Sequence, residues 1–340
     1  MRAGEGRDLV VAMSVVVLGG LYGHSCTLAR SLVTWGSLTV GYEVSDGNDI
    51  VSVGHNWPVS LKLMSDGSLL GDTTTPDGND FVAISAGLLH NLALRSDGSI
   101  VGWQNLLSTL AVPLAWDDLE IPPDGNDFAA IAAGPNHNLA LKTDGSIVGW
   151  GANNYGQATP PEGNDFVAIT AGTWHSLALR NDGSIVAWGA NEYGQATPPN
   201  SNDFVAIDAG VGHSIALRSG GSIAAWGADP WGQAAPPEGN DFVAVAAGGN
   251  HNLALRRDGS IVGWGANLYG QATPPVGNDF VFIAAGGGTS YALTRGPCAY
   301  VLAGDLNGDC RVDLDDLELL MENWLVDCIL CPENPACARE

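Results

Sequence analysis

The sequence predicts an all-β fold, a seven-bladed β-propeller of three-stranded blades, followed by a small C-terminal calcium-binding loop and helix. Three observations carry this prediction. A unit of 38 residues recurs along most of the 340-residue chain. Each unit contains three short apolar or alternating segments bounded by turn residues. A three-stranded sheet cannot bury both faces alone, so the units must stack, and radial stacking leaves few strand edges exposed.

The repeat is clearest in "GNDFVAITAGTWHSLALRNDGSIVAWGANEYGQATPP", residues 163–199. Its histidine marks four copies spaced by 38 residues, at His137, His175, His213 and His251. Looser copies place His24, Trp57, His90 and Thr289 at the same position. The step from His90 to His137 is 47 residues because the loop at residues 104–123 is enlarged.

Seven apolar segments of the "DFVAI" type are expected to be the first strands. They begin near Ile50, Phe81, Phe128, Phe166, Phe204, Phe242 and Phe280. The last copy has no third strand, whereas "SLVTWG" at residues 31–36 is a third strand at the start of the chain. Joining the two closes a ring of seven blades. If "SVVVLGG" at residues 14–20 is also a strand, the ring has eight.

The second and third strands are separated by an Asp-Gly pair in several copies, as at Asp97 and Gly98, and by Gly220 and Gly221 in another. Asp-Gly favours a type I′ turn, so we expect a tight hairpin. Pro-Pro and Gly-Asn then close the unit, because proline cannot donate to a strand ladder.

The pattern "G-x-x-H-[NS]-x-A-L … D-G-S-I-V-x-W-G-x-N-x-Y-G-Q" resembles the regulator of chromosome condensation repeat. The resemblance covers roughly residues 24–295 and is to the short bacterial form, similar to the propeller-type β-lactamase inhibitor protein. It implies a propeller with seven blades of three strands. Nucleotide exchange on a small GTPase is not implied, because the short units match only the repeat.

Charge and motifs argue against several functions. The chain has 13 Lys and Arg against 37 Asp and Glu, a net charge of −24, which repels nucleic acid and anionic lipid. It carries no G-x-S-x-G elbow, no H-E-x-x-H and no phosphate-binding loop. The aspartate of each "N-D-F" is expected to cap a turn. We therefore predict that the protein is not an enzyme and binds neither nucleic acid nor membrane.

Five equivalent histidines could form a metal ring around the axis, but we expect each imidazole to hydrogen-bond within its own blade. The tryptophans that end the third strands are expected to pack between blades; they are Trp103, Trp150, Trp188, Trp226 and Trp264.

The loop after the third strand places an aromatic residue five positions beyond the tryptophan, at Tyr155, Tyr193, Trp231 and Tyr269. All four should emerge on one rim of the disc. Such residues could stack on sugar rings or serve as protein hot spots. They could instead cover the glycines of their own loops.

The C-terminal stretch "GDLNGDCRVDLDD" has the spacing of a twelve-position calcium loop. Its ligands would be Asp305, Asn307, Asp309, the carbonyl of Arg311, Asp313 and Asp316. An amphipathic helix follows. The segment resembles a single type I dockerin repeat, which implies calcium as cofactor. Dockerins carry two such segments, and Cys310 stands here where the turn prefers glycine.

Five cysteines lie in the tail: Cys298, Cys310, Cys328, Cys331 and Cys337. This density indicates disulfides and an oxidising compartment, with zinc as the alternative for Cys328 and Cys331. A disulfide from Cys310 to Cys298 or Cys328 could hold the calcium-loop turn in place of glycine.

The chain is thus divided into a signal segment or N-terminal strand at 1–23, a propeller at 24–297 and a calcium-binding tail at 298–340. We expect an exported, extracellular or cell-surface monomer, a scaffold that binds a protein or a cell-surface glycan, with a tail for attachment or assembly. The alternatives are a secreted inhibitor of another protein and an accessory component of a polysaccharide-degrading system.

Overall fold

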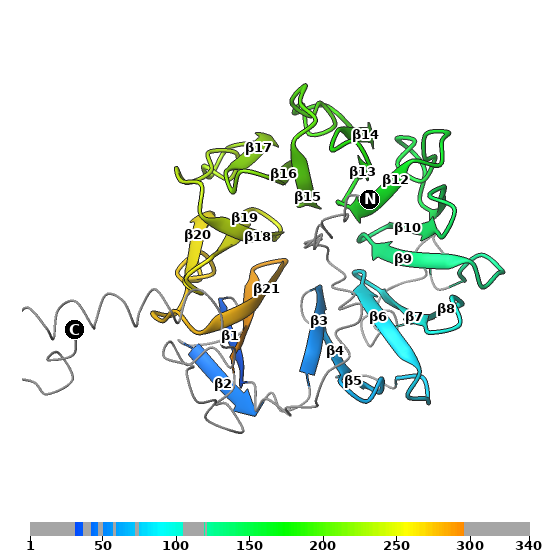
Figure 1. Cartoon of the computed structure of the whole chain (residues 1–340), viewed down its shortest axis with the longest axis horizontal. Coiled ribbons are helices and arrows are strands. Elements are labelled where there is room, and N and C mark those ends of the chain that lie inside the picture. The colour runs from blue at the N-terminus through cyan, green and yellow to red at the C-terminus, as the bar shows by residue number, and fades with distance from the viewer. Residues whose placement is uncertain are drawn as a thin grey trace, which may run out of the picture.

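The protein is a ring of seven antiparallel sheets around a central axis (Figure 1). The computed structural model describes residues 31–36, 42–46, 50–56, 59–71, 75–104, 119 and 121–295. The predicted segment at 1–23 and the predicted tail at 298–340 lie outside these residues. No described helix is long and apolar enough to cross a membrane.

The first strand of each blade lies nearest the axis (Figure 1). These strands are β3 (Ile50–Asn56), β6 (Phe81–Ala86), β9 (Phe128–Ala133), β12 (Phe166–Ala171), β15 (Phe204–Ala209), β18 (Phe242–Ala247) and β21 (Phe280–Gly286). All seven begin at the predicted residues. The middle strands are β4 (Val59–Met64), β7 (His90–Arg95), β10 (His137–Lys142), β13 (His175–Arg180), β16 (His213–Arg218), β19 (His251–Arg256) and β22 (Thr289–Thr294).

The third strands lie on the outer side of their sheets. They are β5 (Leu69–Gly71), β8 (Ile100–Gln104), β11 (Ile147–Gly151), β14 (Ile185–Gly189), β17 (Ile223–Gly227) and β20 (Ile261–Gly265).

The seventh blade joins the two ends of the described chain. Strand β1 (Ser31–Gly36) pairs antiparallel with β22, with Leu32 opposite Leu293 and Gly36 opposite Thr289. The predicted closure is therefore confirmed, and the eight-bladed alternative is wrong. The strand order of this sheet is β2-β1-β22-β21, so β2 (Tyr42–Asp46) adds a fourth strand that the repeat pattern did not predict.

The hydrophobic core lies between blades. One cluster joins Leu177 and Ile185 of one blade to Phe204 and Ile207 of the next, all buried. Burial of one such side chain contributes about 1.5 to 3 kcal/mol. Because every cluster is shared by two blades, a blade is stable only beside its neighbours.

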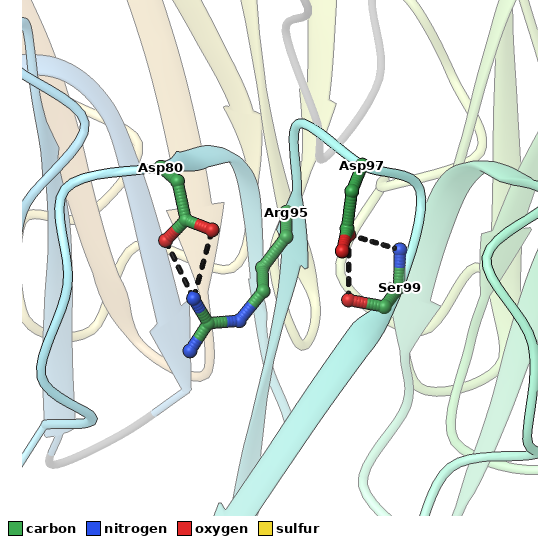
Figure 2. Close-up of polar contacts among 4 residues, drawn as sticks. All are labelled: Asp80, Arg95, Asp97 and Ser99. Carbon is green, nitrogen blue, oxygen red and sulfur yellow. Dashed lines mark hydrogen bonds and ion pairs between the residues drawn. The ribbon is translucent and has the colours of Figure 1, made fainter.

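The hairpin turns differ from the predicted type I′ turn. Gly98 N donates to Arg95 O over 3.0 Å, and Arg95 N donates to Ser99 O over 2.9 Å, so the turn encloses Ser96 and Asp97. Gly98 follows the turn with φ of 84°, as in a three-residue loop with a glycine bulge. Asp97 Oδ1 accepts bonds from Ser99 N and Oγ, which holds this geometry (Figure 2). The type I′ prediction was therefore wrong.

Candidate functional site

The four predicted rim aromatics all lie at the surface. Tyr155, Tyr193, Trp231 and Tyr269 are 49%, 65%, 50% and 64% exposed. They occupy equivalent loops that follow the third strands β11, β14, β17 and β20. We call these four residues the aromatic rim. Exposed aromatic residues therefore stand at equivalent positions of four adjacent blades.

Polar side chains, rather than the aromatic rings, hold the rim loops. In the first of them the buried Gln157 accepts a bond from Tyr155 N at 2.9 Å. Asn153 Oδ1 accepts one from Ala158 N at 3.0 Å. Gln195, Gln233 and Gln271 bond the next three rim backbones in the same way. The loop is fixed by its amides, which leaves the ring available for contact.

The loops between first and middle strands share this face. Ala190 N, in a rim loop, donates to Trp174 O over 2.8 Å. The ring of Trp174 meets that of Tyr155 edge to face, with centroids 5.7 Å apart. This contact extends the aromatic rim across the boundary between two neighbouring blades, which we call a seam.

The repeated histidines link neighbouring blades. His175 Nε2 lies 2.9 Å from Ser214 Oγ in the next blade. Ser214 Oγ donates to Gln195 O, which also accepts a bond from Trp226 Nε1. The prediction that each imidazole binds within its own blade was wrong, because the partner at 39 residues' separation is not visible in a single repeat. The matching contacts are His90 to Asn138, His137 to Ser176, His213 to Asn252 and His251 to Ser290.

The predicted packing of the tryptophans between blades is confirmed where the structure shows it. Trp188, for example, packs on a cluster that includes Leu139 of one blade and Phe166 of the next. The equivalent Trp103, Trp150, Trp226 and Trp264 do the same.

Burial keeps the seam histidines neutral. It lowers the pKa of His137 and of His175 to about 3, and neighbouring imidazoles add to the effect. Burial also lowers the pKa of His213, against the raising effect of Asn252 and Asp229. Among the described residues no three His, Cys, Asp or Glu side chains gather as a metal site.

The aspartates of "N-D-F" lie on the opposite, hairpin face and make ion pairs. Arg95 Nη1 donates to Asp80 Oδ1 over 2.6 Å and to Asp80 Oδ2 over 2.8 Å (Figure 2). The same guanidinium lies 4.6 Å from the ring centroid of Phe81. The expectation of simple turn capping was wrong, since the carboxylate neutralises a cation at the end of the middle strand. The equivalent pairs are Asp127 with Lys142, Asp165 with Arg180, Asp203 with Arg218 and Asp241 with Arg256.

One carboxylate that the sequence analysis missed lines the central cavity. Asp208 is 8% exposed, and its Oδ1 accepts a bond from Thr170 Oγ1 at 3.0 Å in the preceding blade. Its Oδ2 accepts one from Ala247 N in the following blade. This signal was visible in the sequence, because Asp208 stands where the other first strands have Ser, Thr, Ala or Gly. It connects three blades.

The predicted calcium and disulfide residues lie outside the described residues. They are Asp305, Asn307, Asp309, Arg311, Asp313 and Asp316, with Cys298, Cys310, Cys328, Cys331 and Cys337.

Comparison with known proteins supports the repeat and the fold. Residues 128–157, 166–195 and 242–271 match the family model described as Regulator of chromosome condensation (RCC1) repeat. No curated protein matches the chain significantly.

Three solved structures illustrate the likeness of fold. Prp20p from Saccharomyces cerevisiae, studied for its binding to Gsp1p and histones, has a TM-score of 0.64 at 16% identity, with 88% of this chain and 96% of that chain covered. Human WBSCR16 has a TM-score of 0.59 at 15% identity, with 79% of this chain and 99% of that chain covered. The ectodomain of the Arabidopsis thaliana receptor kinase ACR4 has a TM-score of 0.55 at 23% identity, with 69% of this chain and 87% of that chain covered. Three segments of the chain thus match the RCC1 repeat model, and the chain folds as a seven-bladed propeller like those of these structures.

Proposed function

We propose that the protein is a non-catalytic scaffold that binds a protein partner through the aromatic rim. The observation that carries this proposal is the exposure of four large aromatic side chains at equivalent positions of adjacent blades. Tyr and Trp are the residues most often found at interface hot spots. Their loops are held by buried glutamines, so little conformational freedom would be lost on binding.

Proteins of similar fold support a binding role. Prp20p, the yeast RCC1, was studied for its binding to Gsp1p and histones and was also solved bound to Kap60. In the present chain the buried polar groups serve the fold: the seam imidazoles contact the next blade, and Asp208 bridges neighbouring first strands. This use of the buried groups favours a scaffold over an enzyme.

We further propose that the scaffold is exported and that its tail binds calcium for attachment or assembly. The support is the ligand spacing from Asp305 to Asp316 and the density of cysteine after Cys298. Both features are typical of proteins that work outside the cell.

The rim can be tested with a triple variant of the full chain, Tyr193→Ala, Trp231→Ala and Tyr269→Ala. Chemical cross-linking in envelope and culture fractions of the producing cell, followed by capture, would identify partners of the unmodified protein. We expect the triple variant to lose them while keeping its thermal unfolding midpoint, because the three side chains are exposed.

A matched control removes exposed apolar residues outside the tips of the rim loops, Leu70→Ala in β5 and Val276→Ala close to the start of β21, which are 53% and 104% exposed. This control should keep the partners. If the rim variant captured the same partners as the unmodified chain, the rim would not be the binding surface.

A further inference from the structure

The two faces of the propeller differ in charge. Among the described residues, the cations other than Lys62 lie at or beside the hairpin ends of the middle strands: Arg95, Lys142, Arg180, Arg218, Arg256, Arg257 and Arg295. Five of the seven make ion pairs with the aspartate of their own blade. Lys62 lies within β4, between the two faces.

The rim face carries carboxylates and no cation in its described loops between residues 121 and 295. Glu192 directly precedes Tyr193, and Asp229 lies two residues before Trp231; both acidic residues are exposed. The aromatic rim is therefore accompanied by negative charge in the two central loops of the four.

The charge of Asp229 is not needed by its loop. Asp229 Oδ1 accepts a bond from Ala234 N at 2.8 Å. In the neighbouring blades Asn153, Asn191 and Asn267 accept the equivalent bond through a neutral amide. Glu192 likewise stands where other copies have Asn154 or Leu268. The repeat explains neither carboxylate, and Asp229, whose charge also raises the pKa of His213, is still exposed to a partner.

An exposed aromatic ring beside a carboxylate is a suitable surface for a cation. The ring face attracts a guanidinium, and the carboxylate can accept its paired N–H donors. Arginine suits this surface better than lysine because its planar group can stack on a ring and bind a carboxylate at the same time. The net charge of −24 would also accelerate encounter with a basic partner.

We propose that the aromatic rim, with Glu192 and Asp229, binds an arginine-rich segment of a protein partner. This inference rests on the proposed function, because it specifies the chemistry of the partner that the rim would hold. The hairpin face is also acidic, but there Asp97 accepts bonds from Ser99, and Asp80 pairs with Arg95 (Figure 2).

The test uses the full chain and a fluorescein-labelled arginine–serine peptide, with binding followed by fluorescence anisotropy. Measurements at about 150 mM salt limit long-range attraction to a screening length of about 8 Å. A peptide with citrulline in place of arginine keeps the shape and removes the charge. We expect the citrulline peptide to bind at least about tenfold more weakly.

The carboxylates are tested by the double variant Glu192→Gln and Asp229→Asn, whose asparagine reproduces the neighbouring loops. It should weaken arginine-peptide binding about tenfold. A charge-matched control on the hairpin face, Asp144→Asn and Asp182→Asn, keeps an acceptor for Ser146 and Ser184 and should change binding by less than about twofold.

Equal loss of binding in the two charge variants would show general attraction to an acidic protein and would overturn the proposal. Equal binding of the citrulline peptide would overturn it too, as would unaltered binding by the double variant. A further outcome separates this proposal from the proposed function. If the double variant of Glu192 and Asp229 still binds the peptide and the cellular partners, but the triple variant of Tyr193, Trp231 and Tyr269 loses those partners, the rim remains the binding surface. Only the arginine-rich partner is then excluded. If the aromatic variant keeps the cellular partners, the proposed function itself fails.

Discussion

His175 Nε2 lies 2.9 Å from Ser214 Oγ, a residue of the next blade, and both side chains are fully buried. Among the described residues this contact, with Ser or Asn as the partner, recurs at five seams, where it ties a blade to its successor by a polar bond inside an apolar interface. Ser214 in turn donates to Gln195 O, so the rim loop, the serine and the histidine form one network. The stability of the ring and the position of the rim therefore depend on the same residues.

The first prediction concerns this seam. His175→Ala should lower the free energy of unfolding by about 2 to 4 kcal/mol, because it leaves a cavity and removes a hydrogen-bond partner of Ser214. Urea unfolding of His175→Ala, Ser214→Ala and the double variant would give a coupling energy of about 1 kcal/mol. Tyr193→Ala is the control and should stay within about 0.5 kcal/mol of the unmodified chain. Additive effects of the two seam variants would show that the contact contributes nothing.

Stability should fall as the solution becomes acidic. The pKa of His137 and of His175 is about 3 in the folded chain, against 6.5 for an ordinary imidazole. Between these values the unfolded chain binds more protons, so the free energy of unfolding decreases as the pH falls below about 6.5. The slope should be about 1.4 kcal/mol per pH unit for each histidine. Urea unfolding at a series of pH values measures it.

His175→Asn is the matched variant for the pH experiment, since it removes one titrating group and should reduce the slope by about 1.4 kcal/mol per pH unit. The hairpin aspartates affect the free energy of unfolding in a separate, more acidic pH range. The bonds from Ser99 lower the pKa of Asp97 below 3.8, so its contribution is lost only at still lower pH. A free energy of unfolding that stayed constant from pH 7.5 to 5 would contradict the assignment of neutral seam histidines.

Two hairpin glycines should respond in opposite ways. Gly98 has φ of 84°, and an added Cβ would lie 2.3 Å from Asn126 O in the entry loop of the next blade. Gly98→Ala should therefore cost more than about 1 kcal/mol. Gly220 has nothing within 4 Å of an added Cβ, and other copies have Asp there. Gly220→Asp should be neutral or stabilise by up to about 1 kcal/mol. Thermal unfolding midpoints would show both effects; destabilisation by Gly220→Asp would mean that the hairpins are not equivalent.

Substitution of Arg180 should distinguish charge from stacking. Its guanidinium pairs with Asp165 at 2.8 Å and lies 5.1 Å from the ring centroid of Phe166. Arg180→Ala should cost about 1 kcal/mol, because the ion pair is partly exposed. Arg180→Lys should be nearly neutral, since Lys142 makes the equivalent contacts in its own blade. Chemical unfolding would measure both, and equal losses would show that the guanidinium geometry matters.

Calcium binding by the tail stays a prediction from sequence. Isothermal titration of the full chain under oxidising conditions should show binding at millimolar calcium or below, as expected of extracellular modules. Asp305→Ala with Asp309→Ala should abolish the heat, because two side-chain ligands are removed. If the unmodified chain gave no heat on addition of calcium, the segment would be a degenerate loop that does not bind the ion. Mass analysis before and after reduction would test a disulfide at Cys310.

Much of the fold could be predicted because it is encoded locally. The first strands begin at the expected residues, from Ile50 to Phe280, since a run of apolar residues bounded by turn signals needs no partner to be recognised. The closure of β1 on β22 was also predictable, because one end of the repeat array lacked the strand that the other end had. The exposure of the rim aromatics followed from their position in a polar loop.

The sequence alone thus determined the repeat, the strands, the closed ring and the face on which the aromatic rim lies. Tertiary structure decided which groups meet across the seams: His175 with Ser214, Asp208 with Thr170 and Ala247, and Gly98 against Asn126. It also decided that the hairpins are three-residue loops and that β2 extends the seventh sheet. These contacts join residues from different copies, and a pattern that repeats in every copy carries no record of which neighbouring blade a side chain will face. Radial packing supplies that information, because it brings each blade against the next with one fixed register.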